Sequence, residues 1–99
     1  MAKIQIPKNL LDDFCRRWRV RKLSLFGSVL RDDFGPQSDV DVLVEFESGA
    51  MVGYFELADM ESELSQLLGR KADIRTPAEL SRYFRQDVLA AAETQYVSG

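Results

Sequence analysis

The chain has 99 residues and a formal net charge of −3, with 45% hydrophobic residues, one cysteine and no histidine. This composition excludes an internal disulfide, a cysteine-cluster zinc site and any histidine-based catalysis or metal binding. The acidic balance argues against a general nucleic-acid binder, and no apolar run reaches the roughly 20 residues that cross a bilayer. The N-terminus also lacks a signal-peptide hydrophobic region. We expect one cytoplasmic domain over residues 1–99, without membrane contact, in which carboxylates are the only plausible metal ligands.

The first predicted element is a helix from Pro7 to about Arg19. Apolar side chains recur in it at helical spacing and give it a core-facing stripe, which consists of Leu11, Phe14, Cys15 and Trp18. Residues 16–22 then carry five basic side chains in seven. We expect a solvated helix end there, since cations favour the C-terminal end of the helix dipole; contact with phosphates or with an acidic partner is the alternative. A strand is predicted next, from Leu23 to Phe26.

Gly27 and Ser28 follow this strand directly, and Asp39 and Asp41 lie beyond a ten-residue gap. A second strand is predicted from Val40 to Phe46, because β-branched residues alternate along it. Residues two apart on a strand point to the same face, so the two aspartates would project together. Two carboxylates this close repel each other unless a cation lies between them, and Mg²⁺ takes oxygen ligands and keeps phosphates in its shell. The pair therefore predicts a site for magnesium, with room for two ions once phosphates are bound.

The glycine–serine pair supplies the phosphate side of this predicted site. Gly27 would let backbone N–H groups approach an anion closely, and a short helix over residues 29–31 would add partial positive charge there. The Ser28 hydroxyl would bind a terminal phosphate, and Arg31 would neutralise another. A plain hairpin turn is the alternative interpretation of Gly27 and Ser28 alone. The correctly spaced aspartates favour the nucleotide site instead.

A second long helix is predicted from Gly53 to Leu68, because leucine and methionine recur at spacings of three and four and Gly69 is a typical helix stop. Ala72–Arg75 is predicted as a short third strand, on which Asp73 and Arg75 share a face. Asp73 would complete the metal site, and Arg75 would pair with it or with phosphate. Without the upstream motif, Asp73 would be interpreted as a salt-bridged surface residue.

Thr76, Pro77 and Glu79 are typical of a helix start, with threonine as the N-cap and glutamate as its reciprocal partner. The last helix is predicted to begin there, with a break near Ser81 and Arg82 as the alternative to a continuous helix. It is predicted to turn apolar side chains inward; these are Leu80, Phe84, Val88 and Ala91. The order helix, strand, strand, helix, strand, helix predicts an α+β domain with a small mixed β-sheet and helices packed on it.

The segment from Leu25 to Val44 resembles the signature of the minimal nucleotidyltransferases of the DNA polymerase β superfamily, in which Gly-Ser is followed after ten residues by Asp-x-Asp. The resemblance extends from about Ile6 to Val97 and implies the nucleotidyltransferase (polymerase β-like) core. In that family the glycine and serine contact the triphosphate and the two aspartates ligate magnesium. Asp73 matches the third carboxylate of the family, which lies on a later strand.

The resemblance also implies an activity and a partner. Because the core uses essentially all 99 residues, we expect a separate chain to present the acceptor. In the family this chain is a small all-helical toxin of the HEPN type, and the nucleotidyltransferase is its antitoxin, transferring AMP from ATP to a tyrosine hydroxyl. Asp39, Asp41 and Asp73 would be the catalytic residues, and a homo- or hetero-oligomer is compatible with this arrangement.

Two alternatives stay open. Val29 and Asp32 stand where the family commonly has arginine and glycine, so the chain would also fit a binding module that neutralises its partner by occlusion, with a weak or inactive nucleotide site. A nucleotidyltransferase acting on a small molecule is the third possibility, and it suffers from the missing acceptor domain.

Overall fold

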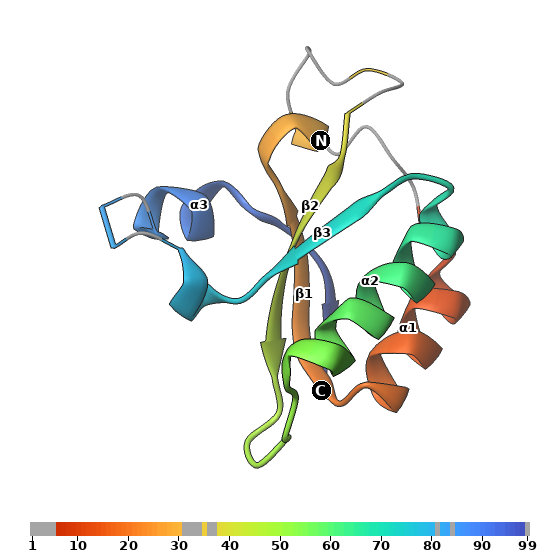
Figure 1. Cartoon of the computed structure of the whole chain (residues 1–99). Coiled ribbons are helices and arrows are strands. Elements are labelled where there is room, and N and C mark those ends of the chain that lie inside the picture. The colour runs from red at the N-terminus through yellow and green to blue at the C-terminus, as the bar shows by residue number, and fades with distance from the viewer. Residues whose placement is uncertain (1–5, 31–34, 36–37, 81, 84, 99) are drawn as a thin grey trace.

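The computed structural model describes residues 6–30, 35, 38–80, 82–83 and 85–98. Figure 1 shows how the elements follow one another along the chain. They are α1 (Lys8–Arg17), β1 (Val20–Phe26), the 3-10 turn η1 (Gly27–Leu30), β2 (Val40–Phe46), α2 (Tyr54–Leu68), β3 (Ala72–Arg75), the 3-10 turn η2 (Pro77–Glu79), α3 (Arg85–Ala91) and β4 (Glu93–Val97). Among the described residues, no helix combines the length and the apolar character that crossing a membrane requires.

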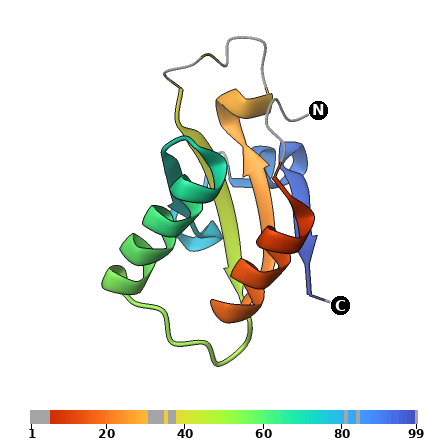
Figure 2. The ribbon, with the colours of Figure 1, turned by 90° about the vertical axis from the view of Figure 1, so that its right-hand side faces the viewer.

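Four strands form one mixed sheet in the order β3-β2-β1-β4. Strand β1 pairs antiparallel with both β2 and β4, whereas β2 pairs parallel with β3. Figures 1 and 2 show α1 and α2 side by side on one face of this sheet and α3 on the opposite face. The predicted α+β class with a mixed sheet is therefore confirmed.

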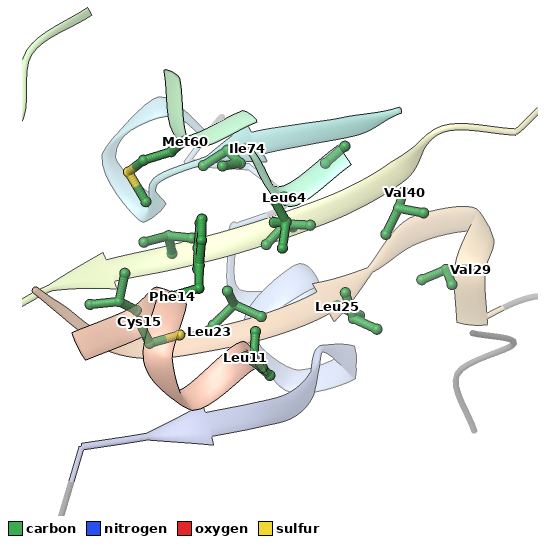
Figure 3. Packing of buried hydrophobic residues seen from close by; sticks show 14 residues of the cluster. Leu11, Phe14, Cys15, Leu23, Leu25, Val29, Val40, Met60, Leu64 and Ile74 are labelled. Carbon is green, nitrogen blue, oxygen red and sulfur yellow. The ribbon is translucent and has the colours of Figure 1, made fainter. Parts of the chain in front are cut away.

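The hydrophobic core lies between the sheet and the pair α1 and α2. Figure 3 shows Phe14 and Cys15 of α1 and Met60 and Leu64 of α2 pointing toward the strands. These four side chains are fully buried, as is Val42 in the middle of β2. Burying one such large apolar side chain contributes about 1.5–3 kcal/mol, so the stripe predicted for the first helix is a main source of stability.

Helix α2 also fixes the free edge of β3. The Ser65 hydroxyl accepts a hydrogen bond from the Ala72 N–H at 2.9 Å, and the Glu61 carboxylate accepts one from the Ile74 N–H at 2.7 Å. An exposed strand edge otherwise presents unpaired backbone groups. These two bonds set the position of β3 beside β2, and with it the position of Asp73.

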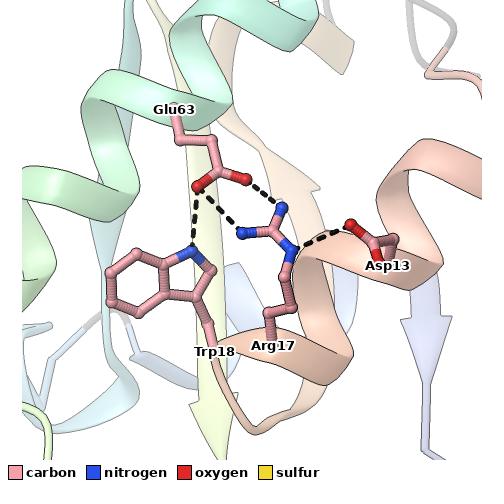
Figure 4. A network of polar contacts seen from close by, with 4 residues as sticks. All are labelled: Asp13, Arg17, Trp18 and Glu63. Atoms are coloured by element: carbon pink, nitrogen blue, oxygen red, sulfur yellow. Dashed lines mark hydrogen bonds and ion pairs between the residues drawn. The ribbon is translucent and has the colours of Figure 1, made fainter.

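The basic residues 16–22 are largely exposed, but three of their arginines pair with acidic residues of this chain. Figure 4 shows the Arg17 guanidinium between the carboxylates of Asp13 and Glu63, with the Trp18 indole N–H donating to Glu63 at 3.3 Å. Arg19 pairs with Glu47 at 3.6 Å and Arg21 with Glu45 at 2.8 Å. The segment therefore ties α1 and β1 to α2 and β2.

A continuous last helix is wrong, and the alternative with a break near Ser81 and Arg82 agrees with the residues described on either side. The Glu79 carboxylate accepts a hydrogen bond from the Thr76 N–H at 3.0 Å, as the capping pair predicts. However, the helical turn that begins there ends at Glu79, because Leu80 has extended backbone angles, and α3 begins only at Arg85. Leu80 is buried outside any helix, Val88 is half-buried and Ala91 is exposed; Phe84 lies outside the described residues.

Three strands are predicted from the sequence, and this number is wrong because β4 adds a fourth strand. Its residues pair with β1 in the register Leu25 with Glu93 and Leu23 with Tyr96. The Ser98 N–H continues the pairing by donating to the Arg21 carbonyl at 2.7 Å. Glu93, Thr94 and Gln95 are polar and show no alternation, so β4 owes its conformation to the neighbouring strand rather than to its own pattern.

Candidate functional site

Gly27 and Asp41 meet at the end of β1. Phe26, the last residue of β1, is the register partner of Asp41 on β2, and Gly27 follows with a φ of +76°. A Cβ atom on residue 27 would overlap Asp41 Oδ2 and lie 3.1 Å from Asp41 Cγ. Only glycine combines this left-handed backbone with such a close approach. The predicted glycine therefore borders one of the two predicted aspartates.

Asp73 lies beside Asp41 across the parallel pair of strands. The two residues are register partners on β2 and β3, so their side chains leave the same face of the sheet. Asp73 is half-buried, and its carboxylate forms an ion pair with the Arg75 guanidinium, which donates a hydrogen bond to it at 3.2 Å, as predicted for these neighbours. Asp39 is exposed and directly precedes β2, whose first N–H, that of Val40, donates to the Lys71 carbonyl at 2.9 Å.

Ser28 belongs to η1, but its side chain lies outside the described part of the structure, as does the whole of Arg31. The next residue of the turn, Val29, is fully buried, and Figure 3 shows it beside Leu25 and Val40. Val29, which stands where the resembled family commonly has arginine, thus packs η1 against the core.

Arg70, just beyond α2, holds the segment that leads to Asp39. Its Nη1 donates to the Gly35 carbonyl at 2.6 Å and to the Ser38 carbonyl at 3.4 Å. The same segment is closed by hydrogen bonds from the Ser38 N–H to the Gly35 carbonyl and from the Gly35 N–H to the Ser38 hydroxyl. No sequence pattern indicates the role of Arg70, because its partners are backbone atoms more than 30 residues away.

A cavity of about 540 Å³ opens beside Gly27, between η1 and α3. Its wall is largely apolar but includes the carboxylates of Asp87 and Glu93. The lining residues are Phe26, Gly27, Leu30, Asp87, Val88, Ala91 and Glu93. A nucleoside needs such a combination of an apolar wall and a few polar acceptors. The sequence gives no sign of this cavity, because one side of it depends on β4, which was not predicted, and on the position of α3 beside it.

The carboxylates suit a hard cation, although their side chains are not gathered around one point. Among the described residues, no three acidic or cysteine side chains are close enough together to hold a metal ion by themselves. Asp41 and Asp73 leave the same face of adjacent strands, and Asp39 lies two residues before Asp41. Oxygen ligands from one or two carboxylates, completed by phosphate and water, are the donor set that Mg²⁺ prefers. The residues therefore fit this ion.

Residues 7–94 match the nucleotidyltransferase domain family. The protein adenylyltransferase MntA of Thermococcus cleftensis is 33% identical over 73 residues, which are 74% of this chain and 72% of that protein. The matched segments span between 57% and 76% of the length of the curated relatives.

Solved structures share the fold. A structure assigned as a minimal nucleotidyltransferase superposes with a TM-score of 0.70 at 32% identity, over 86% of this chain and 85% of that one. A tri-AMPylated HEPN toxin of Shewanella oneidensis in complex with its MNT antitoxin gives a TM-score of 0.65 at 16% identity, over 92% of this chain and 70% of that one. At this lower identity the likeness concerns the fold.

Proposed function

This chain belongs to the nucleotidyltransferase domain family, and we propose that it is an antitoxin that transfers AMP from ATP to a hydroxyl group of a partner HEPN toxin. A tyrosine hydroxyl is the proposed acceptor. The name of the Thermococcus relative, a protein adenylyltransferase, supports the reaction, and the AMPylated toxin in the Shewanella complex supports the partner.

Two relationships carry this proposal: Gly27 borders Asp41, and Asp41 and Asp73 are register partners whose side chains leave the same face of the sheet. Gly27 has no side chain, so its backbone lies directly beside the Asp41 carboxylate. The strand register places the Asp73 carboxylate next to that of Asp41. A plain hairpin turn needs neither the close approach nor the second carboxylate. Nucleotide transfer needs both, because charge on a triphosphate must be held and neutralised during the reaction.

In the proposed reaction, Gly27 and Ser28 hold the β- and γ-phosphates, helped by Arg31. Asp39, Asp41 and Asp73 would hold one or two Mg²⁺ ions, which supply charge neutralisation at the phosphates. The acceptor oxygen attacks the α-phosphorus, the bond from this phosphorus to the β-phosphate oxygen breaks, and pyrophosphate leaves with the electron pair. Asp73, oriented by Arg75, takes the proton of the hydroxyl.

The cavity beside Gly27 is the proposed place for the nucleoside. Its apolar wall of Phe26, Leu30 and Val88 would stack or pack against a base, and the carboxylates of Asp87 and Glu93 would accept hydrogen bonds from an amino group or from ribose hydroxyls. Such acceptors suit adenine, whose exocyclic amino group is a donor. This arrangement supports ATP as the substrate.

The test is intact-mass spectrometry of the HEPN-type protein encoded beside this gene, incubated with the chain, ATP and Mg²⁺. We expect the mass to rise by one or more AMP units. The Asp39→Asn/Asp41→Asn variant should lose about 10²-fold or more of the rate, the scale for removing one preorganised electrostatic group. Glu45→Gln is the matched control, because Glu45 lies on the same strand but pairs with Arg21.

The same experiment separates the occluding binder from the enzyme. The buried Val29 favours this second candidate, since no arginine side chain extends from position 29 toward a phosphate. A stable complex without mass gain, unchanged by the aspartate substitutions, would contradict the transfer reaction and support neutralisation by occlusion. Transfer of AMP to an aminoglycoside instead of to the protein would contradict the proposed partner.

A further inference from the structure

An exposed apolar patch lies at the start of α2. It consists of Met51, Tyr54 and Phe55, whose exposed fractions are 92%, 82% and 81%. The rings of Tyr54 and Phe55 pack edge to face, with their centroids 5.9 Å apart. Single exposed apolar side chains are ordinary, but three large ones within five residues, two of them with their rings in edge-to-face contact, are typical of an interaction surface. Tyrosine and phenylalanine are also enriched in the cores of protein interfaces.

The surroundings of this patch are acidic. Residues 47–69 contain five acidic residues and no lysine or arginine, and of these Glu47 and Glu63 pair with Arg19 and Arg17. Two others, Glu56 and Asp59, are exposed on α2 itself, and Glu56 lines a hollow of about 490 Å³ together with Met51. A second copy of this chain would bring the same acidic surface against it and would be repelled. The complementary surface is instead an apolar recess bordered by lysine and arginine.

A groove joins the patch to the candidate site. Tyr54, Asp73 and Arg75 all line one depression of about 180 Å³, which is formed by residues of α2, β3 and η2. A protein seated on the patch would therefore lie against the carboxylate that we propose as the proton acceptor. A small molecule or nucleotide bound in the cavity beside Gly27 would not contact the patch, so the patch would add nothing to its affinity.

We propose that the exposed apolar patch is the docking surface for the acceptor protein, and that this protein presents an apolar recess bordered by basic side chains. The inference rests on the proposed function, because it assigns the surface that brings the acceptor hydroxyl to Asp73. Docking at Tyr54 and Phe55 would supply orientation, whereas the carboxylates and Gly27 would act on the nucleotide. The two contributions are therefore separable by mutation.

The test uses the full chain and the HEPN-type protein encoded beside it, with complex formation measured by calorimetry and AMP transfer by intact mass. The Tyr54→Ser/Phe55→Ser variant should weaken the complex about 30-fold or more, the loss expected of aromatic hot spots. The KM for the acceptor should rise while kcat and the affinity for ATP stay unchanged. Tyr83→Ser is the matched control, since Tyr83 is 84% exposed but lies outside the patch.

Charge reversal tests the chemistry of the partner. Glu56→Lys/Asp59→Lys should weaken the complex, and added salt should weaken the wild-type complex more than that of the variant. Unchanged or tighter binding by this variant would contradict the proposal that basic side chains border the recess of the partner. If the wild-type chain forms a homodimer that the Tyr54→Ser/Phe55→Ser variant does not form, the patch binds a second copy of this chain. This result would contradict the proposal that the acceptor protein binds there.

The outcomes also distinguish this inference from the proposed function. If wild type and the Tyr54→Ser/Phe55→Ser variant transfer AMP with the same KM, the docking surface is wrong and the function stands. If wild type forms the complex without transferring AMP, and the variant loses the complex, the docking surface stands and the transfer reaction is wrong. If wild type neither binds nor modifies the protein, both are overturned.

Discussion

Asp41 Cγ lies 3.1 Å from the position that a Cβ atom on residue 27 would take, so the Asp41 carboxylate borders the bare backbone of Gly27. The two residues come from the adjacent strands β1 and β2 and meet because Phe26 and Asp41 are register partners. A shift of the register by one residue would turn Asp41 to the opposite face. Strand pairing and the chemistry of the site are therefore coupled at this point.

The first prediction concerns Gly27→Ala. The new methyl group would displace the Asp41 carboxylate, and the left-handed backbone at φ +76° would add about 1–2 kcal/mol of strain. We expect the affinity for ATP with Mg²⁺ to fall at least about tenfold, together with a lower free energy of unfolding. Calorimetric titration and urea unfolding measure the two effects.

Gly49→Ala provides the matched control. Gly49 has a φ of +84°, close to that of Gly27, but nothing lies within 4 Å of a Cβ atom built on it. This variant should lose similar stability and keep its affinity for ATP. Equal losses of affinity in the two variants would show that strain alone is responsible and that the contact with Asp41 has no role.

The elements that could be predicted from the sequence are those whose own pattern decides their conformation. The bounds of β2, Val40–Phe46, and of β3, Ala72–Arg75, agree with the prediction. Helix α2 differs by a single residue at its start, since Gly53 is its N-cap. The positions of Asp41 and Asp73 follow from these strands, and this made the carboxylate part of the candidate site predictable.

The parts that could not be predicted depend on contacts distant in the sequence. Strand β4 forms because β1 offers it an edge, whereas its residues Glu93–Gln95 are polar. The cavity beside Gly27 needs α3 and β4 in place, so it is invisible from the motif. The exposed patch at Tyr54 and Phe55 was not predicted because apolar residues are expected to be buried, and only the structure shows that these two rings are exposed.

The second prediction concerns Arg70, a positioning residue for the segment before Asp39. Arg70→Gln removes the charged donor to the Gly35 and Ser38 carbonyls, and hydrogen bonds to charged groups contribute about 1.5–3 kcal/mol. We expect weaker binding of ATP with Mg²⁺, because Asp39 loses its support. Titration with ATP in the presence of Mg²⁺ measures this.

Arg70→Lys separates positioning from simple loss of stability. A single nitrogen, Nη1, makes both hydrogen bonds, so a lysine ammonium should restore most of the affinity. Arg82→Gln, at an exposed arginine, is the control and should behave as wild type. If Arg70→Gln loses stability but binds ATP normally, Arg70 has no positioning role.

The third prediction concerns the thiol of Cys15. Burial and, to a smaller extent, the nearby Asp12 carboxylate together raise its pKa to about 12. Because the thiolate is the reactive form, Cys15 should not react with a disulfide reagent at pH 8 in the folded protein and should react fully in urea. Ser48→Cys places a second thiol at an exposed position, where one equivalent should react at once. Rapid reaction of wild type would contradict the buried position of Cys15.

The last prediction concerns Glu63, which joins α2 to the end of α1. Hydrogen bonds from the Arg17 guanidinium hold the pKa of Glu63 below its usual value, against the opposing effect of partial burial, and the Trp18 N–H adds to the lowering. A carboxyl group with a lowered pKa binds fewer protons in the folded state, so it contributes stability above its ordinary pKa of 4.5 and loses it as the pH falls. Glu63→Gln should therefore unfold at lower urea concentration than wild type at pH 7, and this difference should shrink toward pH 3. Glu56→Gln, at an exposed position of the same helix, is the control and should show no such pH dependence. If the difference between Glu63→Gln and wild type stays constant with pH, packing rather than charge links the two helices.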